Sequence, residues 1–364
     1  MRQTWVLLVD AYRELNAKRL FWITLILSGA FIGAFALIGF HAGELTFAGY
    51  QMPLLSSEYK PMFSTLVIGL WLTWAALILA LISTAGIFPD LISSGTIDLY
   101  LARPMSRLRL FLTKYFGGLL FVAIQVAVVA VGAFIVMRWR GGVWMPSLFL
   151  AIPLVVLVFS YIFAVCVLMG VWTRSVIAAL LLSILAWGFF SITQMTENGI
   201  LTWKKEIEHR IDQDQRTIAD ADADLQRYQQ HPTDDLLGVG AALAKTRRGD
   251  AQTQLPGLQH DLWLPQLLYR FAVSAWLAVP KTSETADLLD RYLMSDEEAG
   301  VPIEQREQRD AARGRPQRQE RDDAALEVLE ERRHRSIPLI LGTSLLDEAV
   351  CLGLAAWIFC RRDY

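Results

Sequence analysis

The segment Leu110–Val136 reads LFLTKYFGGLLFVAIQVAVVAVGAFIV, and this stretch decides the fold class of the chain. Only Lys114, near its start, carries a charge. The hydrocarbon core of a bilayer is crossed by a helix of roughly 20 apolar residues. A helix that is apolar on every side has no face for water. The segment therefore predicts a transmembrane helix.

Five further segments have the same character, and 54% of the whole chain is hydrophobic while only 19% is charged. They are Leu20–Phe40, Met62–Ile82, Ser147–Val171, Ser175–Thr193 and Ile337–Cys360. One such run is compatible with the buried core of a soluble protein, but six are not, because a soluble fold would leave them without a wet face. We therefore predict an all-α, polytopic membrane protein with six transmembrane helices.

The distribution of Lys and Arg predicts the orientation, because cytoplasmic loops are enriched in both. With the N-terminus in the cytoplasm, the only Lys and Arg residues of the short outer loops are Lys60, Arg138 and Arg140. The cytoplasmic pieces then hold Arg2, Arg13, Lys18, Arg19, Arg103, Arg107, Arg109, Lys114, Arg174, Arg361 and Arg362. We expect a multi-pass protein of the cell (inner) membrane with both termini in the cytoplasm and a tight turn at Arg174.

Residues 1–19 predict a cytoplasmic amphipathic helix that lies on membrane lipid. Trp5, Leu8, Tyr12 and Leu15 repeat at a spacing of three and four residues, so they share one helix face. Aromatic side chains favour the headgroup region of a bilayer. The alternative is a simple cytoplasmic extension of the first span.

Residues 198–336 predict a large helical extracytoplasmic region between the fifth and sixth spans. Apolar residues recur in a heptad-like register from Lys204 to Gln229, with Asp214 as the polar exception. Residues 303–335 are rich in Glu, Arg, Gln and Ala. We expect these two segments to pair as antiparallel helices; the alternative is a mobile, charge-rich linker.

The segment Leu262–Val279 is apolar and aromatic, but Pro265 and Arg270 interrupt it. It predicts an interfacial or re-entrant helix on the outer leaflet. Pro280 ends this helix, and Lys281 opens the next one with a capping pattern. A seventh span here would place the tail outside, which Arg361 and Arg362 oppose.

The cytoplasmic loop 85–109 predicts a short helix held between the second and third spans. Pro89 and Gly95 interrupt helical structure, and Pro104 ends the one or two turns that Thr96–Leu101 can form. Asp98, Arg103 and Arg107 are then expected to face the cytoplasm, where a soluble partner could push on them. The alternative is a plain loop whose arginines only follow the charge rule.

Motifs that carry catalysis or bind a cofactor are absent from the sequence. It contains no Gly-x-x-x-x-Gly-Lys-Ser/Thr phosphate loop, no His-Glu-x-x-His and no Gly-x-Ser-x-Gly. Cys166, Cys351 and Cys360 have no metal-ligand spacing and are interpreted as small hydrophobic residues. We predict no catalytic residue, no metal site and no bound cofactor in this chain, and no nucleic-acid partner.

The polar residues inside the spans are the candidates for a functional site. Asp347 and Glu348 lie near the middle of the sixth span, where a charge is costly and normally faces the bundle interior or an aqueous cavity. Gln125 in the third span is a candidate neighbour. These three residues are predicted to line a translocation path; the alternative is a structural polar contact.

The sequence around the cytoplasmic loop resembles the permease subunits of ABC-2-type ATP-binding-cassette transporters. The matching pattern is Asp90, Gly95-Thr96, an apolar stretch that contains Asp98, Arg103-Pro104, Arg107 after Ser106, and Lys114. The tail Trp357-Ile-Phe-Cys-Arg-Arg-Asp-Tyr364 also looks like the ending of that family. Within it, the chain is most similar to the branch that includes the copper-site maturation permease of nitrous-oxide reductase.

The resemblance implies a transport subunit, an exporter, that has no ATPase site of its own. It implies a dimer with a second permease subunit and two cytoplasmic ATPase subunits, which bind the ATP. The helix around Gly95–Arg103 would be the coupling helix that enters a groove on the ATPase. The insertion at 198–336 departs from the family pattern, so this region is also expected to engage an extracytoplasmic protein partner.

Two other functions compete with the transport subunit. The first is a non-transporting membrane scaffold or sensor that acts through its extracytoplasmic helices. The second is an intramembrane enzyme that uses Asp347 and Glu348; the neighbouring predicted spans offer no partner His or metal ligand for it.

Overall fold

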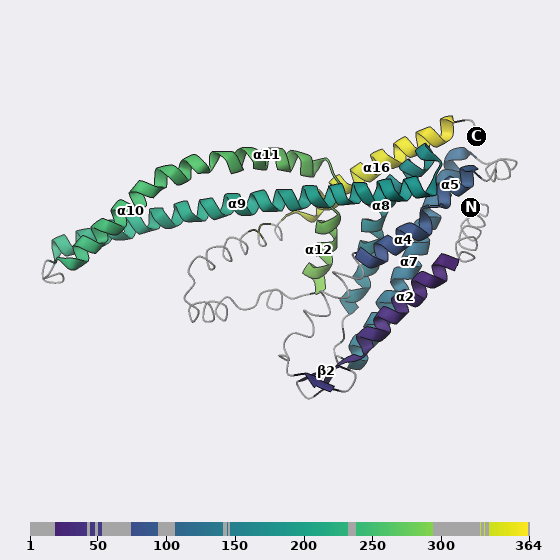
Figure 1. Ribbon diagram of the computed structural model, residues 1–364, viewed down its shortest axis with the longest axis horizontal. Coiled ribbons are helices and arrows are strands. Elements are labelled where there is room, and N and C mark those ends of the chain that lie inside the picture. Colours follow the sequence, from purple (N-terminus) through teal and green to yellow (C-terminus); the bar gives the residue numbers. More distant parts are fainter. Residues whose placement is uncertain are drawn as a thin grey trace. The chain divides into compact units, whose positions relative to one another are not determined.

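The computed structural model describes residues 19–41, 44–47, 50–52, 74–93, 106–140, 144, 146–231, 238–293, 328, 331 and 335–362. These residues are almost entirely helical, with three short strands (Figure 1). The elements are α2 (Arg19–Ala36), β1 (Ile38–His41), β2 (Glu44–Phe47), β3 (Tyr50–Met52), α4 (Ala76–Thr84), α5 (Ile87–Ser93), α7 (Arg107–Arg140), η3 (Pro146–Leu150), α8 (Ala151–Thr173), α9 (Val176–Gln230), α10 (Val239–Asp261), α11 (Trp263–Leu277), α12 (Thr282–Leu293) and α16 (Ile337–Arg361).

Four described helices are long and apolar enough to cross a membrane, namely α7, α8, the apolar part of α9, and α16. They coincide with the predicted third, fourth, fifth and sixth spans and are compatible with a membrane protein. A fifth span would result if α10–α11 and α12, which meet at a bend of 80°, crossed together. The first predicted span corresponds to α2, which is a shorter apolar helix, and residues 62–73 of the second lie outside the described part of the chain.

A small antiparallel sheet follows α2, and the sequence analysis predicted no strand there. β2 pairs with β1 on one side and with β3 on the other, with Ile38 opposite Phe47 and Leu45 opposite Met52. The predicted span ran to Phe40, whereas α2 ends at Ala36. The reason is a change of period: apolar residues alternate with Gly, Thr or His in 38–47, which is the strand pattern.

The chain divides into two compact units. Unit 1 contains the described residues within 1–191, 279–301 and 337–364. Unit 2 contains those within 192–278 and 302–336. Helix α9 begins in unit 1 and continues without a break into unit 2, so the predicted fifth span and the heptad segment after it belong to one helix.

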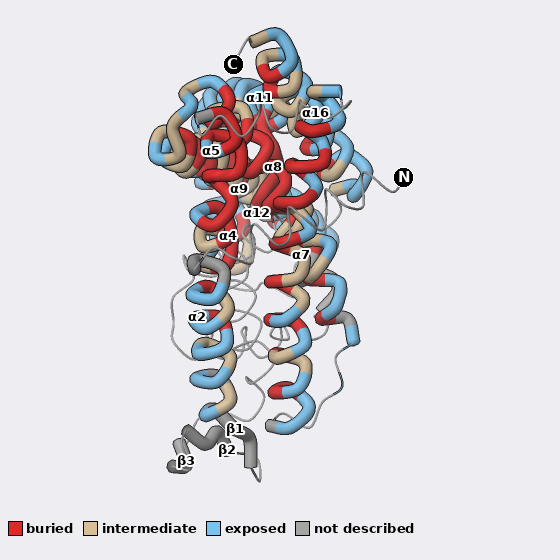
Figure 2. The backbone as a smooth tube through the Cα atoms, turned by 90° about the vertical axis from the view of Figure 1, so that its right-hand side faces the viewer, coloured by how far each residue is buried: buried red, intermediate tan, exposed pale blue. Residues whose placement is uncertain are grey.

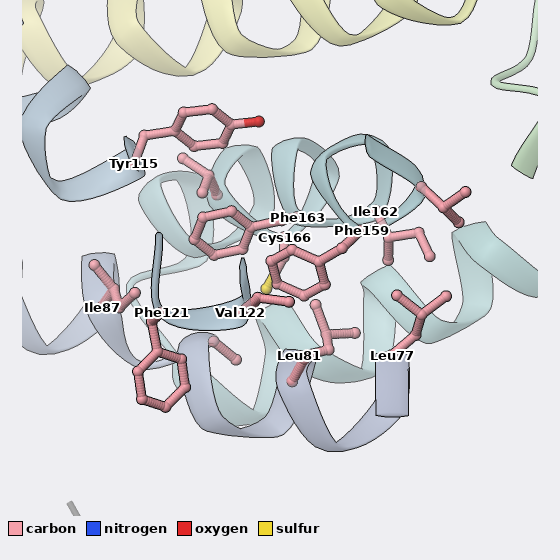
Figure 3. Packing of buried hydrophobic residues seen from close by; sticks show 14 of the residues in the cluster. Leu77, Leu81, Ile87, Tyr115, Phe121, Val122, Phe159, Ile162, Phe163 and Cys166 are labelled. Atoms are coloured by element: carbon pink, nitrogen blue, oxygen red, sulfur yellow. The ribbon is translucent and has the colours of Figure 1, made fainter. Parts of the chain in front are cut away.

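Helix α8 is the centre of unit 1 and packs against α7, α16, α12, α5 and α4. Buried residues concentrate in α5 and α8, whereas α2 is exposed over most of its length (Figure 2). Phe163 of α8 stacks on Tyr115 of α7 at 5.3 Å between ring centroids and on Phe159 at 5.2 Å (Figure 3). The Tyr115–Phe163 contact stabilises the α7–α8 pair, because ring stacking adds to the burial of apolar area.

Helix α5 is docked tightly on this pair. The helix breaks at residues 85–86, and Pro89 then sits in the first turn of α5, where its missing N–H costs no hydrogen bond. Two glycines allow the close approach: a Cβ on Gly118 would lie 2.9 Å from the Phe163 ring and 3.1 Å from Ile87. A Cβ on Gly170 would lie 3.2 Å from Pro89.

In unit 2, the heptad segment of α9 pairs with α10 and α11 in an antiparallel register. Arg248 forms a salt bridge with Asp222 at 3.1 Å, and Lys204 lies 5.1 Å from the centroid of the Tyr269 ring. The predicted partner was the segment 303–335, of which the structure describes only residues 328, 331 and 335. Glu331 of this segment forms a salt bridge with Lys205 of α9 at 3.3 Å, and the pairing of the whole segment stays a prediction. Ala244 and Ala251 are the buried residues of α10.

Candidate functional site

The two acidic residues of α16 lie at its centre and face different neighbours. Adjacent helical residues point about 100° apart. Glu348 faces α7 and α8, where its carboxyl group contacts Tyr115 and Ser160. Asp347 faces Lys281, which precedes α12.

Glu348 is held by one hydroxyl from each neighbouring helix. The Tyr115 hydroxyl donates to Glu348 Oε1 at 2.6 Å. Ser160 Oγ lies 2.9 Å from Glu348 Oε2 and 2.8 Å from the Leu157 carbonyl oxygen. Ring stacking on Phe163 sets the direction of the Tyr115 side chain, as Figure 3 shows. Glu348 therefore joins three helices through a single carboxyl group.

Lys281 is fully buried beside the other face of α16. Its backbone N–H donates to Ser344 Oγ at 2.9 Å, and its ammonium donates to the Val279 carbonyl oxygen at 3.1 Å. The ammonium also interacts electrostatically with the carboxylates of Asp347 and Glu284. A buried ammonium requires such partners, because taking an ion out of water costs several kcal/mol.

We call this set of groups the polar cluster, and all its members belong to unit 1. It consists of Tyr115, Ser160, Tyr161, Lys281, Glu284, Thr285, Ser344, Asp347 and Glu348. Within it, the Tyr161 hydroxyl and Asp347 Oδ2 are buried without a hydrogen-bond partner among the described residues. The described residues hold no group of three or more His, Cys, Asp or Glu placed for a metal ion. The chemistry open to the cluster is the binding of protons or of a polar ligand.

Gln125 was predicted as a neighbour of this site and as a residue of a translocation path, and its place in a path stays a prediction. Both polar atoms of its buried amide lack a hydrogen-bond partner among the described residues, and the partners of Glu348 lie elsewhere. Gln125 is ten residues beyond Tyr115 on α7, which corresponds to about 15 Å along a helix.

The predicted coupling residues are described only in part. Gly95, Thr96, Asp98, Arg103 and Pro104 lie outside the described residues. Asp90 is exposed on α5, between buried Phe88 and Leu91. Lys114 is buried in the bundle at 6% exposure.

Arg107 is the first residue of α7 and is hydrogen-bonded to the C-terminal end of α16. Its guanidinium donates to the carbonyl oxygens of Arg362 at 2.6 Å and Cys360 at 3.5 Å. Arg362 in turn donates to the carbonyl oxygens of Val171 and Trp172 at the end of α8. Helix ends leave their last carbonyl groups unsatisfied, and these two arginines supply donors to them.

The tight turn predicted at Arg174 is present. Helix α8 ends at Thr173 and α9 begins at Val176, with only two residues between them. Arg174 adopts a left-handed conformation with φ of 56°, and its N–H donates to the Gly170 carbonyl oxygen at 2.9 Å. The result is a helix end capped by a residue in the αL region.

Sequence reasoning missed Tyr115, Ser160 and Lys281 as members of the site. The signal for Lys281 was a charge next to an apolar segment, and its capping pattern was assigned only to the start of a helix. Tyr115 and Ser160 carry no signal of their own, because both residue types are ordinary in apolar helices. No protein-family model, curated protein or solved structure matches this chain.

Proposed function

We propose that this chain is the membrane-spanning permease subunit of an ABC-2-type ABC transporter that works as an exporter. In this proposal two separate ATPase subunits hydrolyse ATP in the cytoplasm and bind the segment between α5 and α7. A second permease subunit completes the dimer. The chain itself contributes the path, with Asp347 and Glu348 as its polar residues.

The observation that supports the proposal is the anchoring of the loop at both ends. On the N-terminal side, α5 buries Ile87, Phe88, Leu91 and Ile92 against α7 and α8. On the C-terminal side, Arg107 is hydrogen-bonded to the end of α16. A force applied to residues 94–105 is therefore delivered to α7, α8 and α16 together, as a coupling element requires.

The distribution of charge at this end of unit 1 agrees with a cytoplasmic face. Arg107, Arg174 and Arg362 lie at the ends of α7, α8 and α16. Arg107 donates to the end of α16, and Arg362 donates to the end of α8. Arg361 lies over the Trp357 ring at 4.8 Å. Arginine is enriched on the cytoplasmic side of membrane proteins, and tryptophan is enriched at both membrane interfaces.

The experiment is purification of the tagged full chain from its native cells, with identification of any ATP-binding-cassette ATPase that it retains. We expect the tagged full chain to retain the ATPase, and the variants Arg103→Glu and Gly95→Pro to retain at least tenfold less. Arg247→Glu, an equal charge reversal at an exposed position of α10, is the control and should retain the normal amount. Full ATPase retention by both loop variants would show that the coupling assignment is wrong.

The scaffold or sensor remains a second candidate, favoured by the continuity of α9 from unit 1 into unit 2. A change imposed on one part of this helix is passed along its backbone hydrogen bonds. Deletion of residues 204–335 separates the two functions. A permease should keep its ATP-dependent coupling to the ATPase, whereas a scaffold should lose all function.

A further inference from the structure

We propose that Glu348 is a proton-binding site: it is a neutral carboxylic acid whose proton holds α16 to α7 and α8. The inference goes beyond the proposed transport function and does not depend on it. It rests on the number of hydrogens available to the oxygens around Glu348. All the residues around Glu348 belong to unit 1.

The Ser160 hydroxyl has one hydrogen but two oxygen neighbours. The Leu157 carbonyl oxygen lies at 2.8 Å, and Glu348 Oε2 lies at 2.9 Å. A carbonyl and an ionised carboxylate can only accept. If Glu348 were ionised, one of these two short contacts would contain no hydrogen.

The other carboxyl oxygen cannot resolve this shortage. The Tyr115 hydroxyl donates its single hydrogen to Glu348 Oε1 at 2.6 Å, and its remaining neighbour, the Ser160 carbonyl oxygen at 3.4 Å, is also an acceptor. A protonated Glu348 supplies the missing hydrogen. Its Oε2–H donates to Ser160 Oγ, Ser160 donates to Leu157, and Tyr115 donates to Oε1, so each contact contains one hydrogen.

The charges around the site favour the same state. The cluster contains the carboxyl groups of Glu284, Asp347 and Glu348, but Lys281 is its one ammonium group among the described residues. Lys281 interacts with Glu284 and Asp347. Glu348 forms no salt bridge with any described residue, and an unpaired charge at the centre of an apolar helix is costly.

The titratable groups that face Glu348 come from three helices. They are Tyr115 on α7, Tyr161 on α8 and Cys351 on α16. Asp347 on α16 faces Lys281, which also interacts with Glu284 of α12. No described cation from these elements faces Glu348. When its proton passes to water, a carboxylate remains that must compete with Leu157 for the Ser160 hydrogen. Proton release therefore weakens the contact of α16 with α7 and α8.

Infrared spectroscopy of the full chain in lipid nanodiscs tests the proposal. At neutral pH we expect a carboxylic-acid carbonyl band that disappears as the pH is raised. The band should be absent from Glu348→Gln and retained in Asp347→Asn. Ser160→Ala should shift the frequency of the carbonyl band, because the proton of the acid loses its hydrogen-bond acceptor. Ser160→Ala replaces Glu348→Gln as the test variant if Glu348→Gln does not fold.

Thermal unfolding of the same samples gives a second readout. In the proposal the proton on Glu348 holds α16 to α7 and α8, so its removal should lower the stability of the folded chain. The unfolding temperature of the wild type should drop with rising pH, and that of Glu348→Gln should drop less. A band that is identical in wild type and Glu348→Gln, or one that is lost in Asp347→Asn instead, would overturn the assignment.

Discussion

Two ion pairs of unit 2 have nearly the same geometry but different surroundings. Arg335 Nη2 lies 2.6 Å from Glu197 Oε1, and the two side chains are 13% and 1% exposed. Arg216 lies 2.7 Å from Asp212, and these side chains are 77% and 53% exposed. Arg335 also lies 4.7 Å from the centroid of the buried Trp276 ring. Burial, rather than distance, therefore decides which pair matters for stability.

We predict that Glu197→Ala lowers the free energy of unfolding by about 3–5 kcal/mol, because it leaves the Arg335 guanidinium without its carboxylate in a buried site. Arg216→Ala is the matched control and should cost about 0.5 kcal/mol or less, because water screens an exposed pair. Denaturant unfolding of the full chain measures both. Equal effects of the two variants would contradict the role given to burial.

Residue-level signals in the sequence located the acidic pair but not its partners. Asp347 and Glu348 stand out because they interrupt an apolar run, and the structure places them at the centre of α16. Gln125 stands out for the same reason, yet its amide contacts neither of them. Such contacts depend on how one helix is rotated and shifted along its axis relative to the next. The pattern of apolar residues in one sequence does not reveal this rotation or shift.

At the scale of elements, composition alone predicted α7, α8 and α16 closely, because a helix apolar on every side has no other stable environment. The docking of α5 was not predicted. This docking depends on Gly118 and Gly170, which face Phe163, Ile87 and Pro89 at short distance. The sequence shows the glycines but not which residues face them, so it did not predict the contact. The sheet at 38–52 was missed because Phe40 and its neighbours extended an apolar run.

The docking of α5 yields a prediction for Gly170→Val. Its Cβ would meet the rigid Pro89 ring at 3.2 Å, so we expect a loss of about 1–3 kcal/mol and weaker co-purification of the ATPase. Gly188→Val is the control, since a Cβ there has no atom within 4 Å. Thermal unfolding and co-purification of the full chain provide the two readouts. If Gly170→Val is destabilised but retains the normal amount of ATPase, the packing of α5 is not needed for ATPase binding.

The whole molecule consists of two compact units. Unit 1 holds the polar cluster and the residues on both sides of the segment 94–105, while in unit 2 side-chain contacts join α9 to α10 and α11. The pairing of α9 with α10 and α11 was not predicted, because the sequences of 239–261 and 303–335 are both rich in charged and polar residues.

We propose above all that a cytoplasmic ATPase binds the segment between α5 and α7. Photo-crosslinking in living cells tests it most directly, with a photoreactive residue at Asp98 and a control at the exposed Lys245 of α10. The account predicts that position 98 crosslinks to a Walker-motif ATPase subunit and that position 245 does not. A position 98 that never captures an ATPase, in cells where the chain is present at normal levels, would contradict it.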